Sequence, residues 1–249
     1  MDELCNKVHL KLGQKILKIK KQLKIFLIIE LKCVAWLLKE NGRANLKINK
    51  KKFIYLISPN IILKNFYKNL NLVLQTQKVS FFQLRLKNYS LKRKIVIGKK
   101  IRNICKKNNV KFLINDDPLL SLKLNADGCH LGQKDMKIED AKKIIGKKII
   151  GVTCHNSFNL AKKAIQAKAS YIAFGAFYST KTKKTKYIAS TKILNKTRKF
   201  TKTPIVAIGG INENNYKNLL LNNANFLAIS GYIWKNKKYK PLQAIERLV

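Results

Sequence analysis

The feature that most constrains this chain is a regular alternation of short apolar runs with lysine-rich segments, which begins near residue 53. The eight runs are rich in Ile, Val, Phe and Leu and cover residues 53–59, 79–87, 110–116, 126–132, 147–155, 169–177, 203–210 and 225–233. Near-continuous apolar runs are typical of parallel strands buried on both faces, and the intervening segments 156–168 and 212–224 have helical spacing. The alternation predicts an α/β fold, a (β/α)8 TIM barrel, over residues 53–249 as one domain. An open doubly wound sheet is the alternative.

Residues 1–52 precede the first run and form a basic segment. Their apolar positions recur among lysines at mixed helical spacing, so we expect a helical N-terminal extension. Its most apolar part, residues 25–38, is interrupted by Glu30 and Lys32 and falls short of the roughly 20 apolar residues that a membrane span needs. We therefore predict no transmembrane span and no signal peptide. Contact with an anionic membrane or a partner, packing on the barrel, and no role at all stay open for this extension.

The charge balance is strongly basic, with 53 Lys and Arg against 12 Asp and Glu and a net charge of +41. Clustered cations would suit a phosphate backbone. These cations are dispersed, however, and only six are arginines, the residue that base recognition favours. We therefore expect no specific nucleic-acid partner and a modest preference for small anionic molecules. The oligomeric state stays open, a homo-oligomer included.

The five cysteines lie far apart and form no C-x-x-C pair. This pattern argues against a structural zinc site and against a disulfide framework. It predicts a protein of the reducing cytoplasm.

Half of the acidic residues fall within 25 positions, and they are Asp116, Asp117, Asp127, Asp135, Glu139 and Asp140. Asp116 ends the third predicted strand and Asp135 follows the fourth, so their carboxylates should converge at the functional end of the barrel. Two carboxylates together with phosphate oxygens suit Mg²⁺. Asp127 is expected in a turn, and Glu139 and Asp140 in the first turn of a helix, where they favour the helix dipole.

Cationic side chains follow two of the predicted strands. Gln83, Arg85 and Lys87 share one face at the end of the second strand, so two cations should enter the mouth of the barrel. The loop after the sixth strand, residues 175–184, is rich in hydroxyl groups and cations and contributes Lys183. Both features predict binding of an anion.

Small residues end the last two strands. The seventh ends in Gly209-Gly210 and the eighth in Ser230-Gly231. Loops at these positions of a barrel frequently hold a phosphate group through backbone N–H groups, which glycine allows to approach closely. The mouth should therefore hold a monophosphate beside a metal-bound pyrophosphate.

These motifs together resemble the thiamine phosphate synthase family. The resemblance covers about residues 53–235 and includes QLRLK, the Asn-Asp of LINDD, ADGCHLGQKDM, GVTCH, the T-x-T-K of STKTKK and VAIGGI, in the family's order. It implies the joining of 4-amino-2-methyl-5-pyrimidinylmethyl pyrophosphate to a thiazole phosphate, which gives thiamine phosphate and pyrophosphate. The resemblance thus implies a Mg²⁺-dependent transferase, and the chemistry of this reaction requires no protein nucleophile.

The resemblance also implies roles for individual residues. Mg²⁺ would be held by Asp116 and Asp135. The pyrimidine pyrophosphate would be held by Gln83, Arg85, Lys87, Asn115, Thr153 and Lys183, of which Arg85, Lys87 and Lys183 would stabilise the departing charge. The thiazole phosphate would be held by Thr180, Thr182, Gly210, Ser230 and Gly231. His130 and His155 need no catalytic role.

The sequence departs from the family pattern at Asp117, where an arginine is usual, at Ala176, where a proline is usual, and at Thr153, where a serine is frequent. The segment after Lys184 also lacks the usual glycines. Two other functions stay open. A related thiazole tautomerase would share the barrel and use a histidine near His155, and a non-catalytic basic protein would bind anionic surfaces.

Overall fold

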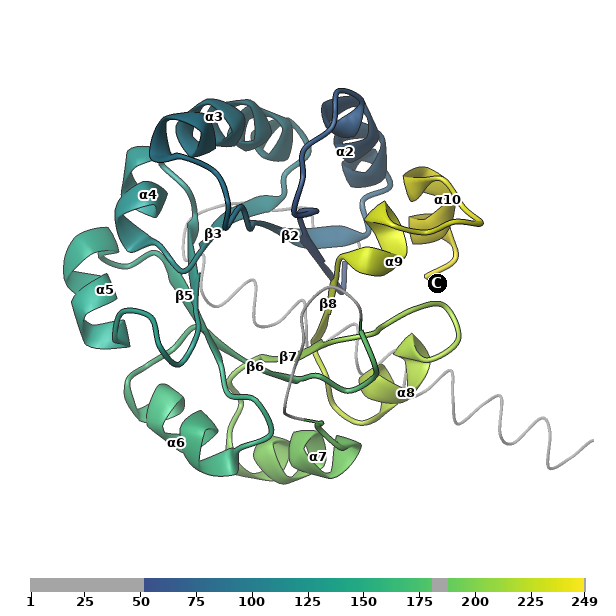
Figure 1. Cartoon of the computed structure of the whole chain (residues 1–249). Helices are drawn as coiled ribbons and strands as arrows, with labels where there is room; N and C mark the ends of the chain where they lie inside the picture. Colours follow the sequence, from purple (N-terminus) through teal and green to yellow (C-terminus); the bar gives the residue numbers. More distant parts are fainter. Residues whose placement is uncertain (1–51, 181–187, 249) are drawn as a thin grey trace, which may run out of the picture. The chain divides into compact units, whose positions relative to one another are not determined.

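The computed structural model of the chain describes residues 52–180 and 188–248. Parallel strands form a closed barrel (Figure 1). There are eight strands in sequence order, and β1 pairs with both β2 and β8. The strands are β1 (Ile54–Ile57), β2 (Val79–Leu84), β3 (Lys111–Asn115), β4 (Gly128–Leu131), β5 (Ile149–Thr153), β6 (Tyr171–Gly175), β7 (Ile205–Ile208) and β8 (Phe226–Ile229). Each lies within one of the eight apolar runs, so the predicted (β/α)8 barrel is confirmed.

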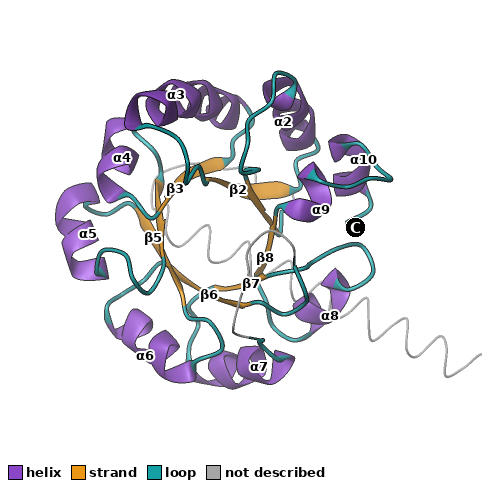
Figure 2. Ribbon diagram, in the orientation of Figure 1, coloured by secondary structure: helices purple, strands orange, loops and turns teal. Residues whose placement is uncertain are grey.

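Helices follow the strands and surround the barrel as an outer ring (Figure 2). They are α2 (Phe66–Gln75), α3 (Leu91–Lys107), α4 (Pro118–Lys123), α5 (Ile138–Ile145), α6 (Phe158–Gln166), α7 (Thr191–Phe200), α8 (Tyr216–Leu221), α9 (Gly231–Trp234) and α10 (Pro241–Glu246). In the part of the chain that the structure describes, no helix is both long and apolar enough to cross a membrane. The predicted extension lies outside the described residues except for Lys52, so its helices and the domain boundary stay predictions.

The barrel interior is filled largely by aromatic rings. Tyr55, Phe81, Tyr171 and Phe226 are at most 2 % exposed, and their rings pack in pairs with centroids 5.0–6.1 Å apart. Aromatic pairs at such separations stabilise a core beyond the apolar area that they bury. Gly151 on β5 provides room for this cluster, because a Cβ atom there would overlap the ring of Tyr171.

Three helices on the barrel begin at residues whose side chains accept a hydrogen bond from the first turn. Ser90 caps α3, Asp117 caps α4 and Ser157 caps α6, by accepting from the backbone N–H groups of Arg93, Leu120 and Leu160. Such caps satisfy backbone donors that the helix itself leaves without a partner. They fix where the loop after each strand ends.

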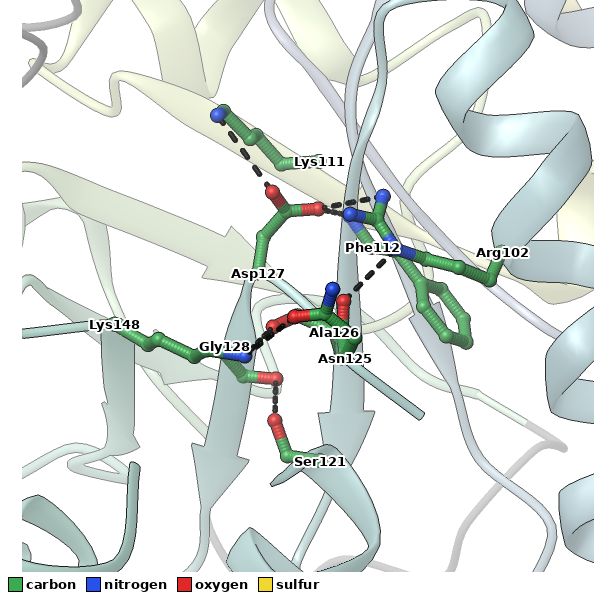
Figure 3. A network of polar contacts seen from close by, with 9 residues as sticks. All are labelled: Arg102, Lys111, Phe112, Ser121, Asn125, Ala126, Asp127, Gly128 and Lys148. Atoms are coloured by element: carbon green, nitrogen blue, oxygen red, sulfur yellow. Dashed lines mark hydrogen bonds and ion pairs between the residues drawn. The ribbon is translucent and has the colours of Figure 1, made fainter. Parts of the chain in front are cut away.

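Asp127, just before β4, has a structural role that its predicted position in a turn did not reveal (Figure 3). Its Oδ2 atom accepts hydrogen bonds from the backbone N–H of Phe112 at 2.8 Å and from Arg102 at 3.3 Å. Lys111 Nζ lies 3.7 Å from the other carboxylate oxygen. Asp127 therefore ties the start of β3 to the start of β4, at the end of the barrel opposite the strand ends where function is expected.

We expect Asp127→Ala to lower the free energy of unfolding by about 2–3 kcal/mol, because the buried N–H of Phe112 would lose its acceptor. Urea unfolding followed by circular dichroism measures this change. Asp140→Ala is the matched control, since Asp140 is exposed and its ion pair with Lys143 lies on the helix surface. That variant should unfold like the parent. Equal stability of the two variants would contradict this role for Asp127.

Candidate functional site

A cavity of about 1050 Å³ opens among the loops at the C-terminal ends of the strands. Its lining includes every described residue that the sequence predicted for the site. These are Gln83, Arg85, Lys87, Asn115, Asp116, Asp135, Thr153, Thr180, Gly210, Ser230 and Gly231. Residues from six different strand ends and the β6 loop are thus brought to one volume. Thr182 and Lys183 lie outside the described residues.

The two cations of the second strand end lie just past β2, which stops at Leu84. Two hydrogen bonds fix Arg85. Its backbone N–H donates to the Ser58 hydroxyl at 2.9 Å, and its guanidinium donates to Asn60 Oδ1 at 3.2 Å. Lys87 is more exposed and lies 3.4 Å from Asp116 Oδ2. The sequence interpretation missed Ser58, although Ser58 follows β1 as Asp116 follows β3.

The Asp116 and Asp135 carboxyl groups lie within hydrogen-bonding reach of each other. The backbone N–H of Asp116 still donates to the His130 carbonyl oxygen at 2.8 Å, and the positive φ of Asp116, 64°, turns the chain where β3 ends. Asp135 Oδ2 accepts from the backbone N–H of Gly132 at 2.7 Å. Burial, with the neighbouring Asp116 carboxyl, raises the pKa of Asp135, whereas Gly132 and Lys87 act in the opposite direction. A divalent cation between the carboxylates would relieve their repulsion.

This arrangement fits Mg²⁺ chemically. Mg²⁺ is usually bound by one or two carboxylates, with the remaining positions taken by water or phosphate oxygens. Within residues 52–180 and 188–248, no group of three or more His, Cys, Asp and Glu side chains could hold a metal ion. Asp116 and Asp135 would thus supply two carboxylates, and water or phosphate oxygens would suit the remaining positions.

Asp117 is adjacent to the carboxylate pair but has a different role. Its side chain accepts from the Leu120 N–H at 2.8 Å as the N-cap of α4, and Pro118 occupies the first turn of that helix. The residue lines a second cavity of about 460 Å³, which shares Lys87, Asn115 and Asp116 with the main one. Asp117 is one of the departures from the family pattern. Its carboxylate caps the helix, and it is not among the residues that line the main cavity.

Hydrogen bonds between side chains of neighbouring strands stabilise the cavity wall next to the carboxylates. The Gln83 side chain is buried, and its Nε2 donates to Asn115 Oδ1 at 3.2 Å. His130 lies 2.7 Å from Thr153 Oγ1 through Nε2 and 2.9 Å from the Tyr171 hydroxyl through Nδ1. Gln133 donates to the Thr153 carbonyl oxygen. These bonds fix Asn115 and Thr153 at the positions where they line the cavity.

The Gly209-Gly210 turn closes the opposite side of the cavity. Both glycines have positive φ, 105° and 65°. A Cβ atom on Gly209 would overlap Ala176, and one on Gly210 would lie 2.7 Å from Tyr178 Cβ. The glycines are therefore required by the close approach of the β6 loop, a reason that the sequence did not show. Ser230, next to this turn, donates from Oγ to the Ser58 carbonyl oxygen at 3.2 Å.

Other residues line the cavity without having been predicted. His155, for which the sequence interpretation required no catalytic role, is part of the wall, and its φ is 51°. Asn212, Tyr232 and Lys235 line the side next to the Gly209-Gly210 turn. Asn212 follows the small-residue turn after β7, so the same strand-end rule could have found it, whereas Lys235 lies at the end of α9.

Comparison with known proteins finds similar chains in one family. A model of the family described as thiamine monophosphate synthase matches residues 54–233, which is the barrel. A thiamine-phosphate synthase of Pelagibacter ubique is 68 % identical over 203 residues, covering 81 % of this chain and 98 % of that protein. One of Erythrobacter litoralis is 36 % identical over 196 residues, covering 77 % of this chain and 92 % of that protein.

Among solved structures, a thiamine phosphate pyrophosphorylase from Pyrococcus furiosus superposes with a TM-score of 0.71 at 28 % identity. The superposition covers 80 % of this chain and 94 % of that one. The likeness thus extends over nearly the whole length of the archaeal protein.

Proposed function

The chain belongs to the thiamine monophosphate synthase family and is a transferase of thiamine biosynthesis, and from that premise we propose how its barrel mouth performs the reaction. The reaction joins 4-amino-2-methyl-5-pyrimidinylmethyl pyrophosphate to thiazole phosphate and gives thiamine phosphate and pyrophosphate. The bond between the pyrimidine methylene carbon and the diphosphate oxygen breaks, and its electron pair leaves with pyrophosphate. The lone pair of the thiazole nitrogen then forms the new carbon–nitrogen bond.

The diphosphate is held by Arg85 and Lys87, with Lys183 as a third cation from the β6 loop. Asp116 and Asp135 would hold Mg²⁺, which when bound would neutralise negative charge on the departing pyrophosphate. Gln83, Asn115 and Thr153 orient the pyrimidine substrate. The observation that carries this assignment is the meeting of the two carboxyl groups beside Lys87 at one edge of a single cavity. Preorganised charges of this kind stabilise charge that develops in a transition state.

The thiazole phosphate is held on the other side of the cavity, by Thr180 and Thr182 of the β6 loop and by Gly210, Ser230 and Gly231. Backbone N–H groups and hydroxyls are suited to a phosphate monoester. With the two substrates in one cavity, the thiazole nitrogen would face the pyrimidine methylene carbon. Positioning of the two substrates then supplies much of the rate enhancement.

No covalent intermediate with the protein is needed. Burial raises the pKa of Cys129 and of Cys154 to about 12, so neither thiol near the cavity is a ready nucleophile. The three cysteines among the described residues are free, in keeping with the reducing cytoplasm that we propose as the site of action.

The test is an assay of pyrophosphate release with both substrates. Synthase activity requires release that depends on Mg²⁺ and on both substrates together. Isomerisation of a thiazole carboxylate phosphate without pyrophosphate release would instead indicate the tautomerase. Binding to anionic surfaces that weakens with salt and persists in Asp116→Asn, with no turnover by the parent protein, would indicate a basic binding protein.

Gly210→Ala should raise KM for the thiazole phosphate about tenfold and leave KM for the pyrimidine substrate unchanged. The new methyl group would press against Tyr178 and displace the loop at Gly210 that is proposed to hold the phosphate. An alanine at positive φ also costs conformational energy. Steady-state kinetics with each substrate varied in turn measures this. Gly146→Ala is the matched control, since Gly146 has φ 63° with no atom within 4 Å of the new Cβ. An equal change in both variants would contradict the cradle.

A further inference from the structure

Four side chains form a continuous hydrogen-bonded file across the barrel interior to the wall of the cavity. The Tyr55 hydroxyl lies 2.7 Å from the Tyr171 hydroxyl, which lies 2.9 Å from His130 Nδ1. His130 Nε2 lies 2.7 Å from Thr153 Oγ1, and Thr153 lines the cavity. The residues come from β1, β6, β4 and β5. Thr153 is thus linked to two tyrosines that do not line the cavity.

The donor and the acceptor of each hydrogen bond follow from Tyr55, the residue at the buried end of the file. Tyr55 and Tyr171 are 2 % and 1 % exposed, and burial raises the pKa of both hydroxyls, which keeps them protonated. Across the described part of the chain, the Tyr55 hydroxyl makes its one hydrogen bond with Tyr171. A buried hydroxyl proton without an acceptor is costly, so Tyr55 donates to Tyr171. The Tyr171 proton must then go to His130 Nδ1.

This order determines the rest of the file. A neutral imidazole has one donor and one acceptor nitrogen, and the neighbours decide which is which. With Nδ1 accepting from Tyr171, Nε2 carries the proton and donates to Thr153 Oγ1. Within residues 52–180 and 188–248, Thr153 Oγ1 has no other hydrogen-bond partner. Its own proton is therefore directed to whatever occupies the cavity.

We propose that Tyr55, Tyr171 and His130 are positioning residues that fix the Thr153 hydroxyl as a hydrogen-bond donor to the pyrimidine substrate. The proposal rests on the proposed function, in which Thr153 contacts that substrate. The atom that accepts is a lone-pair oxygen or nitrogen of the substrate. If every hydrogen bond in the file ran in the opposite direction, the Thr153 hydroxyl would donate to His130. The substrate would then face a hydrogen-bond acceptor instead of a donor.

The packing around the file holds it in place. The His130 and Tyr171 rings are stacked, with centroids 5.7 Å apart and planes inclined by 19°. The Tyr171 ring occupies the space that a side chain at Gly151 would fill. The Tyr55 ring also packs on Tyr171, with centroids 5.7 Å apart. The rings therefore have little freedom to exchange their hydrogen bonds.

The first test is the tautomer of His130, which needs neither substrate nor turnover. The chain contains three histidines, so ¹⁵N-histidine spectra of the full protein are simple to assign with a His130→Gln reference. The proposal predicts the Nε2–H tautomer for His130 in the parent protein at neutral pH. It also predicts a mixture of tautomers in Tyr171→Phe, which keeps the ring and removes the hydroxyl. An Nδ1–H tautomer in the parent protein would overturn the proposal.

The second test is a double-mutant cycle between Tyr171→Phe and Thr153→Val. Each single variant should raise KM for the pyrimidine substrate, Thr153→Val by about tenfold and Tyr171→Phe by several-fold, with kcat changed less. In the Thr153→Val background, Tyr171→Phe should have no further effect on KM. Thr153→Ser, the conservative variant that keeps the hydroxyl, should recover most of the affinity that Thr153→Val loses. Equal effects of Tyr171→Phe in both backgrounds would overturn the proposal. Failure of the proposed function would appear as absent turnover in the parent, with the tautomer result unaffected.

Discussion

Asp116→Asn is expected to lower kcat/KM for thiamine phosphate formation by about 10²–10³-fold while the protein stays folded. The substitution removes half of the carboxylate pair proposed to hold Mg²⁺, and with it charge stabilisation of the departing pyrophosphate. Asparagine tolerates the positive φ of 64° at this position, so the backbone can stay in place. Pyrophosphate release at saturating Mg²⁺, with circular dichroism for folding, measures the effect.

Asp117→Asn is the matched control for this experiment. Asn caps helices as well as Asp does, so α4 should keep its N-cap. Activity should stay within about threefold of the parent. A tenfold loss would require the loss of a contact worth about 1.4 kcal/mol, and Asp117 is not proposed to contact either substrate. If Asp117→Asn lost activity and Asp116→Asn kept it, the metal assignment would be wrong.

Arg85→Met should cause the second large loss, again on the order of 10²-fold or more in kcat/KM. Arg85 lines the cavity, its guanidinium donates to Asn60 and its backbone N–H donates to Ser58, so the residue is already fixed beside the cavity before substrate binds. Methionine keeps the unbranched stem and removes the charge. We expect kcat to fall as well, measured with the pyrimidine substrate saturating, because the departing pyrophosphate carries more charge than the bound substrate.

Arg93→Met separates this loss from the general effect of removing one of many cations. Arg93 lies on α3 with its guanidinium 5.1 Å from the centre of the Tyr89 ring, and it does not line the cavity. The variant should retain parent activity at low and high ionic strength. A comparable loss in Arg93→Met would mean that net charge, and not the placement of Arg85, governs the reaction.

The barrel could be predicted from the sequence because parallel strands buried on both faces leave an apolar run for each strand. The ends of the runs were less informative. The run at 225–233 continues past β8 into α9, where Ile233 is buried and Trp234 donates to the Ile57 carbonyl oxygen at 2.7 Å. Apolar composition does not distinguish a buried strand from a short buried helix.

The predicted site residues within the described ranges meet in one cavity because the strand-end rule depends only on topology. Their individual roles stay predictions. The hydrogen bonds of Asp117 and Asp127 could not be predicted from the sequence. In a sequence, an aspartate that caps a helix or connects two strands cannot be told from one that binds a metal. The file from Tyr55 to Thr153 joins four strands whose facing residues depend on the register of the closed barrel.

The most direct test of the central claim is a crystal structure of the full chain with Mg²⁺ and pyrophosphate bound. The account predicts one ion with oxygens of both Asp116 and Asp135 at about 2.0–2.1 Å, and pyrophosphate oxygens completing its octahedron beside Arg85 and Lys87. An ion held by pyrophosphate with either carboxylate turned away, or pyrophosphate bound elsewhere in the cavity, would contradict it.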